Sequence, residues 1–127
     1  APQAAEGAEQ ILFSVLAANG LTVTPAPQQQ QPADEFPLED SQRLQQALQW
    51  ARQRGDTYAI TGSVEEWQYK SGLDGEPAVG ITLRVIEPAS GRILWSASAA
   101  RAGWSRESLA GAAQTVLESL VADLPLQ

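Results

Sequence analysis

The sequence predicts an α/β protein of the α+β kind, in which about three helices pack on a mixed, mostly antiparallel sheet. Residues 58–103 carry the main evidence, because three apolar runs there repeat with the two-residue period of strands and are joined by polar, glycine-containing connections. The segments on either side show the spacing of amphipathic helices. A chain of 127 residues can bury one core but not two, so residues 1–127 are expected to form a single domain.

The first helix is predicted over Ala4–Asn19. Apolar residues recur in it at positions i, i+3, i+4 and i+7, and Asn19 followed by Gly20 is a typical helix stop. The buried stripe is expected to contain Ala8, Ile11, Leu12, Val15 and Leu16. Residues 21–24 then predict a short strand that ends at Pro25.

A proline- and glutamine-rich segment, residues 25–37, predicts a surface loop without regular structure. The second helix follows it, with Asp40 or Ser41 as the N-cap and Gly55 as its end. Trp50 falls beside the buried stripe, so we expect it either to edge the core or to meet a neighbouring subunit. The stripe itself contains Leu44, Ala47, Leu48 and Ala51.

Residues 58–103 are predicted to form three consecutive antiparallel strands. In the first strand the apolar parity changes between Val64 and Trp67, which predicts a bulge near Glu65 and Glu66. Neighbouring carboxylates on a regular strand point to opposite faces, so these two glutamates are not expected to act as an acid–base pair. The core-facing residues of the other two strands are Val79, Ile81, Leu83 and Val85, then Ile93, Trp95, Ala97 and Ala99.

The C-terminal helix is predicted over residues 105–124, with Ser105 as its N-cap. Trp104 immediately precedes that cap and has two interpretations. It can form a hydrophobic staple against Leu109. Alternatively, with Arg101 and Arg106 beside it, it can lie at a membrane interface, where indole rings sit at headgroup level and arginines meet lipid phosphates. The residues alone favour the staple.

The charge of the chain is unevenly distributed. The net charge is −7, and residues 1–40 contain six acidic residues and no lysine or arginine. Phosphate binding needs a basic surface, so nucleic acid is not an expected partner. A cationic polymer or a basic protein surface fits better, although acidic residues that only keep the domain soluble are the simpler interpretation.

The residue types needed for catalysis are scarce. The sequence has no cysteine, methionine or histidine, which removes the commonest general base, the thiol nucleophile and most zinc ligands. Asp74 and Glu76 lie close together in a polar hairpin tip, but no histidine or third carboxylate completes a site with them. The sequence therefore predicts a protein that is not an enzyme and has no metal or cofactor.

The sequence also contains no apolar run that approaches the roughly 20 residues needed to cross a bilayer.

The order of the elements, the hairpin VIEPASGRILWSA and the helix start WSRESL together resemble the PelC family of outer-membrane lipoproteins from Pel exopolysaccharide export systems. The resemblance covers essentially the whole chain, and more broadly the pattern is similar to the TolB N-terminal-like α/β domains of envelope lipoproteins. Members of the family have a lipidated cysteine and an opening strand before the first helix. The resemblance thus implies that both lie upstream of Ala1, and that the protein is periplasmic and anchored to the inner leaflet of the outer membrane.

For function, the resemblance implies a homo-oligomeric ring, a dodecamer, beneath the export porin PelB. Asp74, with Glu76 in the same tip, would line an electronegative funnel that guides the cationic Pel polysaccharide, while Trp104 with Arg101 and Arg106 would face the membrane. Two other functions stay open at this point. One is an envelope lipoprotein that binds and activates a peptidoglycan synthase, which can act as a monomer; the other is a hydrolase that uses Asp74 and Glu76.

Overall fold

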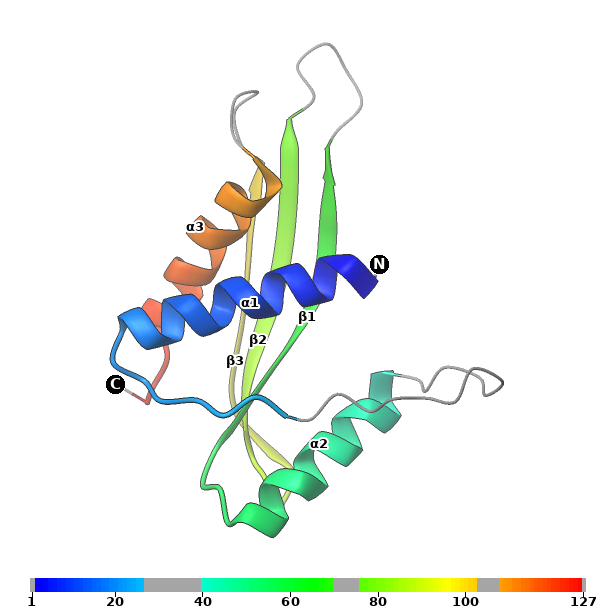
Figure 1. Cartoon of the computed structure of the whole chain (residues 1–127), viewed down its shortest axis with the longest axis vertical. Coiled ribbons are helices and arrows are strands. Elements are labelled where there is room, and N and C mark those ends of the chain that lie inside the picture. Colours follow the sequence, from blue (N-terminus) through cyan, green and yellow to red (C-terminus); the bar gives the residue numbers. More distant parts are fainter. Residues whose placement is uncertain (1, 27–39, 70–75, 103–107, 127) are drawn as a thin grey trace.

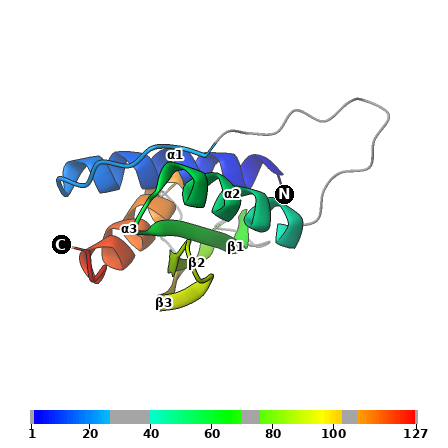
Figure 2. The same cartoon turned by 90° about the horizontal axis from the view of Figure 1, so that it is seen from below.

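The structure is a computed structural model of the whole chain, and it describes residues 2–26, 40–69, 76–102 and 108–126. These residues form three helices and three strands (Figures 1 and 2). In chain order they are α1 (Pro2–Ala18), α2 (Asp40–Arg54), β1 (Ala59–Tyr69), β2 (Pro77–Glu87), β3 (Arg92–Ala102) and α3 (Leu109–Ala122).

The strands form one sheet in the order β1-β2-β3, and both neighbouring pairs are antiparallel. The predicted α+β class and the three-stranded meander are confirmed. The predicted strand over residues 21–24 is wrong, because residues 21–26 have no regular secondary structure. Leu21 instead completes the end of α1: its backbone N–H donates to the Leu16 carbonyl at 3.0 Å, after Gly20 has turned the chain at φ 79°. Within the described residues the sheet is therefore wholly antiparallel rather than mixed.

The core lies between one face of the sheet and the helices α1 and α3, which Figure 2 shows layered against it. Alternate residues of β2 enter this core, as their two-residue period predicts. Burying a large aliphatic side chain contributes about 1.5–3 kcal/mol, so this layer is a major source of stability. Its buried members are Ala8, Val15 and Leu16 of α1, Val79, Ile81, Leu83 and Val85 of β2, Ala112, Ala113, Val116, Leu117, Leu120 and Val121 of α3, and Leu124 beyond it.

The last helix begins later than predicted. Its N-cap is Ser108 rather than Ser105, and the helix ends at Ala122 rather than at residue 124. The Ser108 hydroxyl accepts the Gly111 backbone N–H at 2.9 Å, which satisfies one of the amides that a helix start leaves unpaired. Both serines are good caps by residue type, and only the three-dimensional surroundings select between them.

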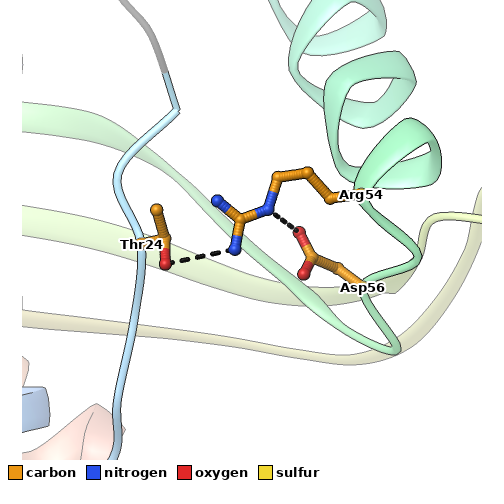
Figure 3. Close-up of polar contacts among 3 residues, drawn as sticks. All are labelled: Thr24, Arg54 and Asp56. Carbon is orange, nitrogen blue, oxygen red and sulfur yellow. Dashed lines mark hydrogen bonds and ion pairs between the residues drawn. The ribbon is translucent and has the colours of Figure 1, made fainter.

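Helix α2 packs against the end of the sheet where β1 begins (Figure 1). It is mostly polar and buries Leu48 and Ala51, two members of its predicted stripe. The Arg54 side chain at its C-terminus lies over the Trp50 ring, 4.6 Å from the ring centroid. The same guanidinium reaches Thr24 Oγ1 at 3.3 Å and the Asp56 carboxylate at 3.2 Å (Figure 3). Arg54 therefore ties together the segment after α1, the end of α2 and the approach to β1.

The sheet is interrupted by two register shifts. One lies in β1 between Val64 and Glu66, where the parity change predicted a bulge, and that prediction is confirmed. The other falls between Val85 and Ile86 of β2, where Leu94 of β3 is left without a partner in the register. Leu94 is 43% exposed, as expected for a residue pushed out of a ladder.

Gly62 marks a close approach between β1 and β2. A Cβ at this position would lie 2.9 Å from the Thr82 backbone oxygen and 2.9 Å from Leu83 Cδ2. At Gly80, by contrast, the nearest atom to an added Cβ would be Glu66 Cβ at 3.5 Å, an ordinary contact. Of these two positions, only position 62 therefore requires glycine for steric reasons.

Gly62→Ala is expected to lower the free energy of unfolding by about 1–3 kcal/mol, because the added methyl group must displace the backbone of the neighbouring strand. Gly80→Ala is the matched control in β2 and is expected to change stability by less than about 1 kcal/mol. Urea unfolding followed by circular dichroism measures both values. Equal losses in the two variants would show that the close approach at Gly62 does not determine the residue there.

Candidate functional site

Most of the predicted functional residues belong to two connecting segments, residues 70–75 and residues 103–107. Both segments leave the sheet at the same end. Tyr69 pairs with Pro77 and Ala78 pairs with Ala102, so the end of β1, the start of β2 and the end of β3 lie side by side. Figure 1 shows these ends gathered with the start of α3 at the top of the sheet. Segments 70–75 and 103–107 therefore leave from one place, which is the candidate functional end of the molecule.

A hydrogen bond joins the strand side of this end to the helix side. The backbone N–H of Leu109, the first residue of α3, donates to the Tyr69 hydroxyl at 3.3 Å. Together with the Ser108 cap, this bond satisfies a second amide of the first helical turn. The contact fixes where α3 starts relative to the β1–β2 hairpin, and it accounts for a helix that begins at Leu109 and not at the earlier serine.

The structure places two of the five predicted site residues. Glu76 is half-buried immediately before β2, and Arg101 is half-buried near the end of β3. Arg101 pairs with Val79, which pairs in turn with Trp67, so these three side chains form a row on the core-facing side of the sheet. Glu76 and Arg101 thus lie at the same end of the sheet, the first just before β2 and the second in β3.

The other three predicted site residues, Asp74, Trp104 and Arg106, lie outside the described residues. The predicted staple between Trp104 and Leu109 nevertheless needs correction. With Ser108 as the N-cap, the residue before the cap is at position 107 and the fourth helical residue is Ala112. Trp104 and Leu109 are therefore not the pair that a staple joins. This leaves the membrane-interface interpretation of Trp104 as an expectation.

The bulge in β1 changes the predicted placement of the two neighbouring glutamates. Glu66 pairs with Gly80, and the Glu65 carboxylate accepts a hydrogen bond from the Thr82 hydroxyl at 2.8 Å. Gly80 and Thr82 lie two residues apart on the face of β2 opposite to the core, so both carboxylates are on that one face. The prediction that they point to opposite faces is wrong, because the bulge inserts one residue into the alternation.

A chain of hydroxyl groups supports the Glu65 carboxylate. Ser63 donates to it at 2.9 Å, and Thr82, which is only 5% exposed, donates at 2.8 Å. The Thr82 and Ser98 hydroxyls are 2.6 Å apart. Since the single Thr82 proton is directed to the carboxylate, Ser98 donates to Thr82. One bonded network therefore crosses all three strands of the sheet.

This network lies in a shallow hollow on the face that α1 and α3 leave uncovered. The hollow is lined by Glu65, Gly80, Ile81, Thr82, Ser98, Ala99 and Ala100. Apart from Glu65 and Ile81, the residues that line it are small or carry a hydroxyl group, so another backbone surface can approach closely. The sequence signal for this arrangement was the parity change between Val64 and Trp67. That change predicted the bulge, but it was not used to place Glu65 and Glu66 on one face.

Within residues 2–26, 40–69, 76–102 and 108–126, no three histidine, cysteine or acidic side chains gather in a way that suits a metal ion. No helix among the described residues has both the length and the apolar content of a membrane span.

Comparison with known proteins gives a clear result at the level of solved structures. No family model and no curated protein matches the chain. The chain is similar to the PelC dodecamer from Paraburkholderia phytofirmans, with 34% identity and a TM-score of 0.73 over 96% of this chain and 76% of that one. A single-substitution variant of the same dodecamer gives 33% identity and a TM-score of 0.71 over 96% and 77%. A lipoprotein from Neisseria meningitidis is 20% identical over 59% of this chain and 53% of that one, with a TM-score of 0.46.

Tyr69→Phe is expected to loosen the first turn of α3, because it removes the hydroxyl that accepts the Leu109 N–H. The bond is exposed, so the loss in stability should not exceed about 1 kcal/mol, while amide hydrogen exchange at Leu109 should become faster. Tyr58→Phe, at a similarly exposed tyrosine in the connection to β1, is the control and should leave that amide unchanged. Unchanged exchange in both variants would contradict a structural role for the Tyr69 hydroxyl.

Thr82→Val is expected to cost about 1–2 kcal/mol of unfolding free energy, since it keeps the shape of the side chain and removes a buried hydroxyl bonded to a carboxylate. Thr61→Val is the matched control, on the same face of the neighbouring strand β1. Chemical denaturation of both variants tests the network. A loss at Thr61 as large as that at Thr82 would mean that the hydroxyl chain adds no stability of its own.

Proposed function

The chain belongs to the PelC family, and from this membership we propose that it is a non-enzymatic, ring-forming lipoprotein subunit that guides the cationic Pel polysaccharide to the outer-membrane porin PelB. The observation that carries the proposal is the 33–34% identity over 96% of the chain to a protein solved as a dodecamer. On this proposal the chain also assembles into a ring of identical subunits, a dodecamer like its relative, on the periplasmic side of the outer membrane. An N-terminal lipid would hold it at the inner leaflet.

The arrangement of the candidate functional end supports a guiding role. Glu76 lies at this end, beside the segment that holds Asp74. Repeated around a ring, such carboxylates create a negative mouth that attracts a polycation through many weak and salt-screened interactions. Weak binding suits transport, because a polymer that is held tightly by any one residue cannot move on. The acidic residues of segment 1–40, among them the exposed Glu6 and Glu9, add to the same negative field.

The same end of the sheet also supports the membrane contact. Arg101 lies near the end of β3, just before the segment that contains Trp104 and Arg106. A tryptophan flanked by arginines is suited to the headgroup region of a bilayer. Since both segments leave from one end of the subunit, the proposed funnel and the proposed membrane belt belong to one rim of the ring, where the polymer passes toward the porin.

The proposal predicts an assembly much larger than the 13.5 kDa subunit. Light scattering across a range of protein concentrations, in low and moderate salt, measures its mass. If the purified domain is a monomer, the same measurement on the lipidated protein in liposomes follows, because membrane attachment raises the local concentration. A monomer under both conditions would contradict the ring and would favour a regulator that docks as a single copy.

Asp74→Ala and Trp104→Ala are each expected to reduce secreted polymer several-fold while leaving the ring mass unchanged. The first removes a carboxylate from every repeat of the funnel, and the second removes an aromatic group from every repeat of the membrane belt. Glu118→Ala is the matched control, because it removes an exposed carboxylate from the outer surface of α3. Normal secretion in both test variants would refute the roles of these residues without refuting the ring.

A further inference from the structure

We propose that the basic outer surface of α2 in one subunit contacts the uncovered sheet face around Glu66 in a second copy of the chain. The inference rests on the proposed ring and adds to it by naming the two surfaces that meet. Three observations carry it: a sheet face that α1 and α3 leave uncovered, an exposed carboxylate on that face whose side chain has no partner among the described residues, and a helix whose charge is opposite to that of its own chain.

The uncovered face is acidic and smooth at its centre. Glu65 and Glu66 are both exposed on it, and the neighbouring Gly80, Ser98 and Ala100 are small. Glu65 is already bonded to Thr82 and Ser63. No hydrogen bond or ion pair involves the Glu66 side chain in the part of the chain that the structure describes. The basic residue on this face is Arg84, which lies two positions beyond Thr82 along β2 and is partly buried. Glu66 therefore remains available to a partner.

Helix α2 is the helix with the matching charge. It contains Arg43, Arg52 and Arg54, three of the eight basic residues of the chain, against one acid, Asp40. The exposed surfaces of the other two helices are acidic, with Glu6 and Glu9 on α1 and Glu118 on α3. Four exposed glutamines also lie along α2, and their amides can donate to carboxylates and hydroxyls. These are Gln42, Gln45, Gln49 and Gln53.

Within one subunit the last turn of α2 and Glu66 are separated along β1. Helix α2 contacts β1 and is joined by a short connection to its start at Ala59, while Glu66 lies seven residues further along that strand. At about 3.3 Å per residue this is roughly 23 Å, well beyond the length of an arginine side chain. Arg52 is exposed in the last turn of α2, and its side chain makes no hydrogen bond or ion pair within the described residues. The proposed contact therefore joins two different surfaces of neighbouring copies, and repeated contacts of this kind close into a ring when the rotation between copies closes.

Charge reversal tests the contact. Glu66→Arg alone and Arg52→Glu alone each place like charges opposite one another at every contact, so each variant is expected to fall from the ring mass to the subunit mass. An equimolar mixture of the two variants is expected to recover the ring mass, because every contact in an alternating ring again joins an acid to a base. The recovered rings should dissociate more readily in high salt than at low salt.

Two reversals away from the proposed surfaces serve as controls, Glu118→Arg on α3 and Arg92→Glu at the start of β3, and both should keep the ring mass. Circular dichroism of each variant shows whether the subunit still folds. If the wild type forms a ring and the single variants keep it, or if their mixture fails to recover it, this contact is wrong while the ring stands. If the wild type forms no ring in solution or in liposomes, the proposed function fails and the contact fails with it.

Discussion

The packing of alternate β2 side chains against α3 and α1 is the interaction on which the rest of the molecule depends. Val79, Val85 and Val121 of that interface are completely buried. Once the odd-numbered residues of β2 face the helices, antiparallel pairing decides which residues of β1 and β3 join the core and which face outward. This single choice of register places small and polar side chains on the opposite face. The bonded network and the position of Glu66 follow from it.

Much of this arrangement could be predicted from the residues, because strand period and turn composition are local properties. The β1 bulge was predictable for the same reason, since one inserted residue is enough to change the parity within an apolar run. The effect of the bulge on the directions of Glu65 and Glu66 was not predictable, because those directions depend on which residues of β2 the two glutamates face. Ser105 and Ser108 are equally good caps in sequence, and the Tyr69 hydroxyl, distant in the chain, favours the second. The strand predicted at residues 21–24 had suitable residues but has no partner strand among the described residues.

The candidate site shows the same division between local and distant information. The sequence predicted Glu76 in the tip of the first hairpin and Arg101 beside the loop that holds Trp104; the structure has Glu76 immediately before β2 and Arg101 near the end of β3, at the same end of the sheet. The residues expected to contact polymer and lipid most directly, Asp74 and Trp104, lie outside the described residues, so their roles remain proposals. The hydroxyl and carboxylate network in the middle of the sheet was missed entirely, because Ser63, Thr82 and Ser98 are distant in sequence and unremarkable as residue types.

The connection of the three strands, each paired with the next along the chain, also has a kinetic consequence. A meander pairs strands that follow one another in the chain, so pairing them requires no long loop closure. We therefore expect each newly made subunit to complete its sheet before it encounters another copy. Assembly would then be the docking of finished surfaces, whose rate depends on concentration and long-range charge, and would not involve folding on contact.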